Sequence, residues 1–142
     1  MTQFAVAFSA LIHDVDHPGV PNATLVNERA EIARMYNNQS VAEQNSVDLA
    51  WSLLMEPAYD DLRMHIYSTQ TEMDRFRQLI VNSVMATDIC DKDLGALRKA
   101  RWVKAFDAPS SSQTTETEDD INRKATIVIE HLIQVRLKNG VM

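Results

Sequence analysis

An all-α fold is what the sequence predicts, and three observations predict it. The 142 residues include only three Gly and four Pro, the residues that interrupt helices most strongly. Hydrophobic residues make up 45% of the chain, which is enough for one domain with a buried core. In most segments apolar residues recur every three or four positions, as on one face of a helix, and the alternation typical of strands is rare.

Four helices are predicted in the first half of the chain. Pro18 and Gly19 make a turn after an apolar helix, because proline cannot extend it and glycine permits a sharp bend. Asn22 is positioned to cap the second helix. Ser40 and Glu43 have the spacing of a capping box, which starts the third. The four helices are expected over residues 3–13, 23–36, 41–55 and 58–65, with a polar break at 37–40.

Three further helices are predicted in the second half, over residues 71–90, 91–106 and 121–133. Residues 108–120 contain Ser, Thr, Glu and Asp but no large apolar side chain, which is typical of a solvated acidic loop. The last helix is expected to bury a stripe that includes Ile127 and Leu132, with Glu130 on its other side. Residues 135–142 are basic and are expected to form an irregular, atypical tail.

Two His and two Asp residues directly follow the first apolar helix, at His13, Asp14, Asp16 and His17. A neutral imidazole suits a borderline ion such as Zn²⁺, and a carboxylate can bind one ion or bridge two. Four ionisable groups within five residues favour a metal site at the helix end. The less favoured alternative is a polar helix terminus whose charges are solvated.

The extended motif is His-Asp-x-Asp-His-Pro-Gly over residues 13–19, followed by Asn22, Tyr36-Asn37-Asn38 and Glu43. In this form it resembles the catalytic domain of the class I 3′,5′-cyclic-nucleotide phosphodiesterases, a branch of the HD metallohydrolase superfamily. The resemblance covers roughly residues 4–134. It implies an all-helical catalytic domain that hydrolyses cAMP or cGMP to the 5′-monophosphate in signal transduction. It also implies two divalent metal ions, Zn²⁺ and either Mg²⁺ or Mn²⁺.

The resemblance also implies roles for individual residues. His13 and Asp14 would bind the first, zinc-like ion, and Asp14 would bridge to the second. His17, Glu43 and Thr87 match catalytic positions beside the waters of the second ion. For Glu43 a helix cap remains an alternative, and for Thr87 a polar helix end. Asp16 is expected to form a salt bridge or to accept hydrogen bonds in the turn instead of binding metal.

The sequence departs from the family pattern in several places. A His-Asn-x-x-His motif is expected upstream of this region, a last metal-binding Asp near Leu137, and a purine-binding segment downstream, and none is present. Gln44-Asn45-Ser46 stands where the family commonly has Asn-His-His. We therefore expect residues 1–142 to be a partial catalytic domain, incomplete at both ends and inactive by itself.

Two other functions remain open: a catalytically dead helical module that binds a nucleotide or a partner, and an HD phosphohydrolase acting on non-cyclic substrates. The net charge of -6 argues against nucleic-acid binding. No apolar run reaches the roughly 20 residues of a membrane span. The single Cys90 fits the reducing cytoplasm. The resemblance leaves room for regulatory or cyclase domains elsewhere, and for this chain as the cytoplasmic part of a larger membrane protein.

Overall fold

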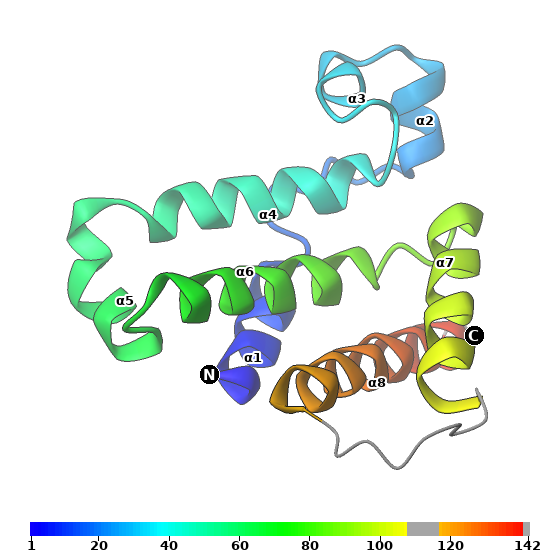
Figure 1. Cartoon of the computed structure of the whole chain (residues 1–142). Coiled ribbons are helices and arrows are strands. Elements are labelled where there is room, and N and C mark those ends of the chain that lie inside the picture. The colour runs from blue at the N-terminus through cyan, green and yellow to red at the C-terminus, as the bar shows by residue number, and fades with distance from the viewer. Residues whose placement is uncertain (108–116, 141–142) are drawn as a thin grey trace. The chain divides into compact units, whose positions relative to one another are not determined.

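A computed structural model of the chain describes residues 1–107 and 117–140 (Figure 1). Within these ranges the regular elements are all helices, so the predicted all-α fold is confirmed. The chain divides into two compact units, Met1–Asp88 and Ile89–Met142, and each is described by itself. None of the helices in the described ranges combines the length and hydrophobicity of a membrane span.

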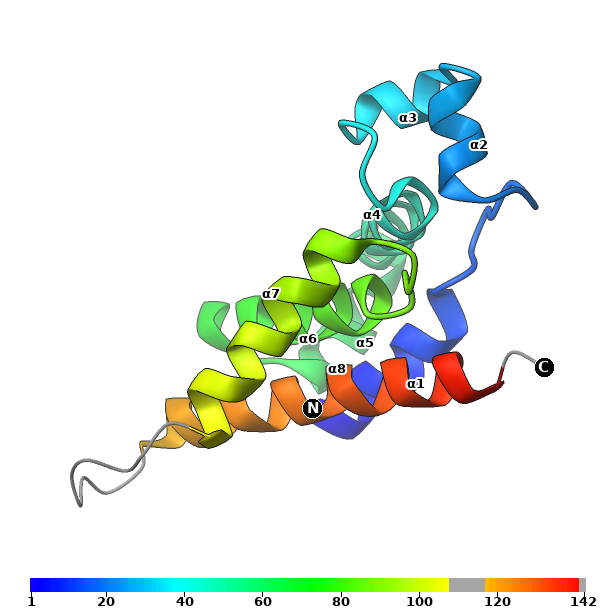
Figure 2. The same cartoon turned by 90° about the vertical axis from the view of Figure 1, so that its right-hand side faces the viewer.

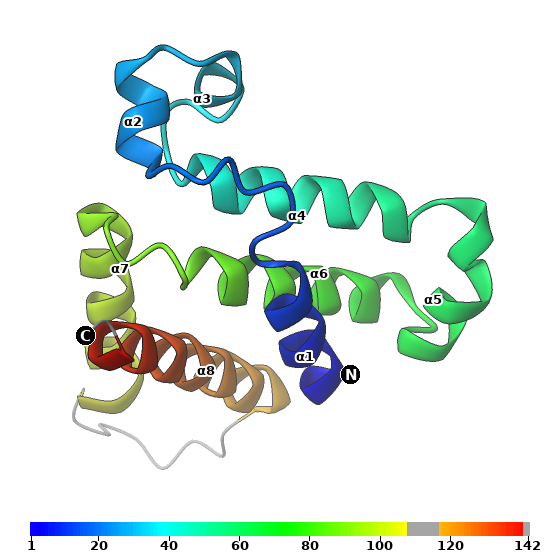
Figure 3. The same cartoon turned by 180° about the vertical axis from the view of Figure 1, so that it is seen from behind.

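The first unit is built around three helices. α1 (Thr2–Ile12) crosses α6 (Gln70–Met85), and α4 (Val41–Leu54) lies along α6 (Figures 1 and 3). The shorter elements connect these three: α2 (Asn22–Asn27), α3 (Glu31–Met35), the 3₁₀ helix η1 (Pro57–Tyr59) and α5 (Asp60–Ile66). The His-Asp-x-Asp-His-Pro-Gly motif over residues 13–19 lies on the turn that follows α1. This turn contacts the first half of α4.

Phe76 of α6 is the centre of the core of this unit. Its ring is fully buried, and four other aromatic rings surround it at centroid distances of 6.0–6.4 Å. They belong to Phe4, Phe8, Trp51 and Tyr67. Leu79, Ile80 and Val84 continue the buried face of α6, as their helical spacing predicts.

The predicted helix over residues 23–36 is instead two short helices, α2 and α3. Arg29 adopts a left-handed conformation with φ of 54° between them. The next residue, Ala30, then donates its backbone N–H to the carbonyl of Leu25, which closes α2. The expected cap by Asn22 is also wrong, because Pro21 is the N-cap and Asn22 is the first residue of α2.

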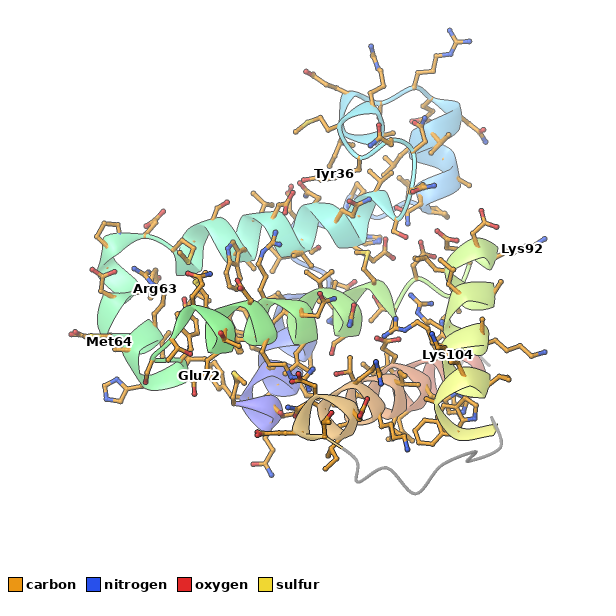
Figure 4. The ribbon with its side chains drawn as sticks, in the orientation of Figure 1. Tyr36, Arg63, Met64, Glu72, Lys92 and Lys104 are labelled. Carbon is orange, nitrogen blue, oxygen red and sulfur yellow. The ribbon has the colours of Figure 1, made fainter. Side chains whose placement is uncertain are left out.

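The capping box predicted at Ser40 and Glu43 is wrong as well. Ser40 is left-handed, with φ of 37°, and its side chain makes no cap hydrogen bond to α4. A capping box with the same spacing starts α6 instead: the Thr69 hydroxyl accepts from the Glu72 N–H, and the Glu72 carboxylate accepts from the Thr69 N–H. Glu72 lies at this end of α6 in Figure 4.

Replacing Thr69 by Ala is expected to lower the free energy of unfolding by about 1 kcal/mol, because the first turn of α6 loses its side-chain acceptor. Hydrogen bonds from the backbone of Ser68, and also from Thr69, lower the pKa of Glu72. Equilibrium unfolding in urea measures the loss. Thr71→Ala makes the same chemical change on an exposed residue of the same turn and should cost little. Equal losses for the two variants would contradict the role of the cap.

The second unit consists of α7 (Lys92–Trp102), a π-helical turn η2 (Val103–Asp107) and α8 (Glu118–Gly140). α7 packs against α8 (Figure 2). The Trp102 ring contacts the rings of Phe106 and His131 at centroid distances of 4.6 and 4.5 Å. The predicted loop lies mostly on residues 108–116, outside the described residues. The irregular tail expected from residue 135 is wrong for the backbone up to Gly140, which continues α8.

The buried face of α8 differs from the predicted stripe. Glu130, expected on the outer side, is only 3% exposed, whereas Leu132 is 58% exposed. Thr126 and Ile127 are buried one turn before Glu130. The buried face of α8 is therefore centred on these three residues, and it is rotated about the helix axis relative to the predicted stripe. Nη2 of Arg101 donates to Oε1 of Glu130 at 3.1 Å and compensates the buried charge.

Replacing Glu130 by Gln is expected to change how stability depends on pH. Burial raises the pKa of Glu130, and Arg101 opposes that rise only in part. The folded chain therefore holds this proton more tightly than the unfolded chain, so stability falls as the pH rises from the ordinary glutamate pKa toward the raised one. Gln has no charge to bury. In urea unfolding between about pH 4 and pH 7, the variant should gain stability relative to the wild type as the pH rises. Parallel pH profiles would contradict this.

Candidate metal centre

His13 is held at the end of α1 with one ring nitrogen facing the backbone. It is the C-cap residue, and its backbone N–H donates to Ser9. Its Nδ1 lies 2.9 Å from the carbonyl oxygen of Ala10. Because a carbonyl can only accept, this contact places a proton on Nδ1. Metal-binding histidines commonly donate their second ring N–H in this way, which leaves Nε2 for the ion.

The Nε2 atom of His13 lies 3.2 Å from Oδ2 of Asp14. When the imidazole is neutral, both atoms are acceptors, so a cation or a proton must compensate their approach. Metal–ligand bonds of about 2.0–2.1 Å at a tetrahedral angle would separate two donor atoms by about 3.3 Å. The side chains are 38% and 69% exposed, so an ion can reach them from solvent. The pair therefore fits two ligands of one metal ion.

Within residues 1–107 and 117–140, no three His, Cys, Asp or Glu side chains are grouped to hold a metal ion. His17, predicted beside the second ion, lies in the exposed turn, where its Nδ1 accepts from the backbone N–H of Gly19 at 3.1 Å. Asp16 accepts from Nδ2 of Asn45 at 3.1 Å, so its donor lies on α4 and not within the turn. His13 and Asp14 are thus the two candidate ligands that the structure brings together.

Glu43 belongs to a second polar cluster, which sequence analysis did not foresee. Nδ2 of Asn22 donates to Glu43 at 2.8 Å and to Asp88 at 3.4 Å, and its Oδ1 accepts from the backbone N–H of Ala42. Asp88 is buried and also accepts from the hydroxyl of Ser40 at 2.8 Å. The available signal was an acidic residue, Asp88, shortly after the end of α6 at Met85. Glu43 is therefore held by Asn22 and not by a helix cap.

Thr87 donates its hydroxyl to the carbonyl of Val84 at 2.7 Å, a local bond at the end of α6. This bond is typical of the polar helix end that the sequence left open as an alternative. A hydroxyl that donates to the backbone can still accept a hydrogen bond. Its neighbour Asp88 belongs to the cluster around Asn22, so Thr87 lies next to that cluster in sequence.

The Tyr36-Asn37-Asn38 segment forms the tight turn between α3 and α4. Asn37 and Asn38 have φ values of 53° and 61°, a left-handed conformation that asparagine tolerates better than most residues. Tyr36 packs between the short helices and α4 (Figure 4). Burial raises the pKa of Tyr36, and the charge of Asp48 and a hydrogen bond with it raise the pKa further. The motif therefore shapes the backbone that leads to Glu43.

Known proteins resemble the chain in sequence and in structure. A probable 3′,5′-cyclic-AMP phosphodiesterase of Caenorhabditis elegans is 38% identical over 85 residues, which is 60% of this chain and 12% of that protein. A 3′,5′-cyclic-AMP phosphodiesterase isoform of Drosophila melanogaster is 38% identical over 84 residues, 58% of the chain and 12% of the relative. The chain thus spans about an eighth of the length of these curated relatives.

Among solved structures, the phosphodiesterase domain of the RhoPDE fusion protein of the choanoflagellate Salpingoeca rosetta matches with a TM-score of 0.68 and 27% identity. The match covers 94% of this chain and 39% of that one. The family model described as 3′5′-cyclic nucleotide phosphodiesterase matches residues 1–135. This range includes the His13–Asp14 pair and the cluster around Asn22. The resemblance that the HD motif indicated is therefore confirmed, and the chain belongs to the 3′5′-cyclic nucleotide phosphodiesterase family.

Proposed function

We propose that this chain forms part of the catalytic domain of a metal-dependent phosphodiesterase, which hydrolyses 3′,5′-cyclic nucleotides to 5′-monophosphates in signal transduction. The observation that carries the proposal is the family match over residues 1–135. The relatives described above are named as cyclic-AMP phosphodiesterases, so cAMP is the substrate to test first and cGMP the second.

His13 and Asp14 would hold a zinc-like ion through Nε2 and Oδ2, the two atoms that lie 3.2 Å apart. Asp14 would also help to hold a Mg²⁺ or Mn²⁺ ion. Bound divalent ions activate a water for attack on phosphorus and neutralise charge on the phosphate. The protein's part is to orient the donor atoms: the Ala10 carbonyl fixes the His13 ring, and the turn places Asp14 beside it.

We assign catalytic, water-orienting roles to His17, Glu43 and Thr87. Glu43 is half-buried, and Asn22 fixes its carboxylate, so one oxygen is constrained while the other can accept from a water. The ring of His17 is oriented by the Gly19 N–H, and the hydroxyl of Thr87 keeps its acceptor capacity. These roles require the rest of a catalytic domain, so residues 1–142 alone are expected to be inactive.

The proposal also includes regulatory or cyclase domains elsewhere in the same protein. The proposed location is the cytoplasm, or the cytoplasmic side of a larger membrane protein. The structural neighbour in Salpingoeca rosetta is the phosphodiesterase domain of a protein named as a fusion, which supports the idea of further domains in the same protein.

The test is a chimeric enzyme in which residues 1–135 replace the matching segment of the Salpingoeca rosetta phosphodiesterase domain. It should convert cAMP or cGMP to the 5′-monophosphate, leave the linear 5′-monophosphate intact, and lose turnover when EDTA removes divalent ions. Circular dichroism establishes that the chimera is folded. A folded chimera that binds metal but hydrolyses no cyclic nucleotide would refute the proposal.

A second candidate is a module that binds a nucleotide without hydrolysing it. The specific observation in its favour is that Gln44-Asn45-Ser46 replaces the Asn-His-His that the family commonly has there. In the same chimera, this function would appear as saturable binding of cAMP with no 5′-AMP formed, and substituting His13 would leave that binding unchanged.

A further inference from the structure

The turn that carries His13 and Asp14 has little core of its own. Residues 13–19 are exposed or half-buried, and both Asp16 and Gly19 have positive φ values, of 57° and 74°. Two backbone hydrogen bonds order the turn locally, from Val15 to Ile12 and from His17 to Asp14. Exposed loops of this kind are usually mobile unless something outside them holds them.

Two consecutive side chains of α4 hold this turn. The hydroxyl of Ser46, which is fully buried, donates to the carbonyl of Val15 at 2.7 Å. Nδ2 of Asn45 donates to Oδ2 of Asp16 at 3.1 Å. The acceptors are the two residues that immediately follow Asp14. Each contact spans about 30 positions of sequence, so it fixes the turn against a different helix.

α4 is a rigid support for these contacts. Val47, Ala50 and Leu54 lie in the same core cluster as Phe76. At its first turn, Asn22 also binds the backbone of Ala42, so the chain between His13 and α2 is attached to α4 at both ends. A helix packed in this way moves less than the loop it holds.

We propose that Asn45 and Ser46 are positioning residues for the metal pair: by fixing residues 15 and 16, they hold the donor atoms of His13 and Asp14 at a separation suited to one ion. The inference rests on the proposed function, since it concerns that same site. It also gives a role to two residues at which this chain departs from the family pattern. Asn45 and Ser46 bind no ion in this scheme; they orient the residues that do.

The magnitude follows from the strength of one hydrogen bond. Losing a single bond of this kind should lower the ratio of the binding-ready turn to the open turn about three- to tenfold, and the apparent affinity for a metal falls by at most that factor. The predicted effect of Ser46→Ala or Asn45→Asp is therefore an affinity for Zn²⁺ that is weaker by about two- to tenfold. Asn45→Asp keeps the shape of the side chain but replaces its donor with a carboxylate that faces Asp16.

The experiment uses the full chain at fixed neutral pH and Zn²⁺ alone as the probe. Binding is followed by isothermal titration calorimetry, with His13→Ala as the reference for lost binding, and the NMR signals of the His13 ring identify this ligand in every variant that keeps it. Hydrogen exchange of the Val15 and His17 amides reports the order of the turn without any metal. Ser52→Ala is the matched control, because it makes the same chemical change on an exposed residue of α4. It should alter neither measurement.

A reversed pair supplies the rescue. Asp16→Asn combined with Asn45→Asp re-creates the bond with the donor on the turn, and asparagine accepts the left-handed backbone of position 16. The double variant should recover both the Zn²⁺ affinity and the slow exchange that Asn45→Asp loses. If restoring this one hydrogen bond restores the Zn²⁺ affinity, the bond acts by positioning the ligands and not through the general stability of the fold.

Three results would overturn the inference. Zn²⁺ affinity that is unchanged in Ser46→Ala and Asn45→Asp, while His13→Ala abolishes binding, would leave the proposed function intact and reduce both residues to structural ones. Unchanged amide exchange would show that the turn does not depend on them. Zn²⁺ binding that does not depend on His13 in the parent chain would instead defeat the metal assignment, and the inference with it.

Discussion

Asp14→Asn in the chimeric phosphodiesterase is expected to lower kcat by about three orders of magnitude or more, because in the proposed site Asp14 is an anionic ligand of both ions and an amide cannot replace it. The substitution keeps the shape of the side chain, and Asp14 is 69% exposed, so the fold should tolerate it. His13→Ala should have an effect of similar size. Initial rates of cAMP hydrolysis at saturating Mg²⁺ or Mn²⁺, together with the melting temperature, measure the loss of turnover separately from any loss of fold.

Two matched variants show whether that loss is specific to the ligand. Asp16→Asn makes the same change two residues away, on a carboxylate that accepts from Asn45, and should cost far less. Glu43→Gln should lower kcat about 10–100-fold, as changes next to metal ligands typically do. Near-normal turnover in Asp14→Asn would refute the metal assignment. A loss from Glu43→Gln as large as that from Asp14→Asn would give Glu43 a direct role at the metal or in proton transfer.

Local patterns in the sequence predicted the helices that carry the site, and they did so for a physical reason. The apolar spacing of α1, α4 and α6 is recorded within each helix, and burial of Phe76, Leu79 and Ile80 satisfies it. The His13–Asp14 pair could also be predicted from the sequence, because its two members are adjacent in the chain. The contact of Asn22 with Glu43 and Asp88 could not be predicted from the sequence, because it joins three separate segments.

The wrong capping box shows how such long-range contacts override local signals. Ser40 and Glu43 have the right spacing, as do Thr69 and Glu72. At Thr69 the bonds form within the helix start, and the motif is real. At Ser40 the backbone is left-handed, and its hydroxyl instead satisfies the buried carboxylate of Asp88 from the end of α6. A buried charge without hydrogen-bond donors costs more than a missing cap, so the tertiary contact prevails.

The largest effect on stability is expected at Phe76. Phe76→Ala should lower the free energy of unfolding by about 3–5 kcal/mol, since the ring is fully buried and its removal leaves a cavity. A domain of this size is typically stable by only about 5–15 kcal/mol, so the variant would lose much of the stability of the first unit. Urea unfolding followed by circular dichroism measures the change. Phe76→Leu, expected to cost less, provides a graded result if the alanine variant does not fold.

Phe4→Ala is the control for this prediction, because it removes the same side chain from the same aromatic cluster. Its ring centroid is 6.0 Å from that of Phe76, but Phe4 is 41% exposed, so less apolar area returns to water and solvent fills the space left behind. The loss should therefore be well below that of Phe76→Ala. Equal losses would mean that the cluster contributes through ring contacts alone. A small loss at Phe76 would mean that α1, α4 and α6 do not depend on a common core, and the support for the turn that carries His13 and Asp14 would have to lie elsewhere.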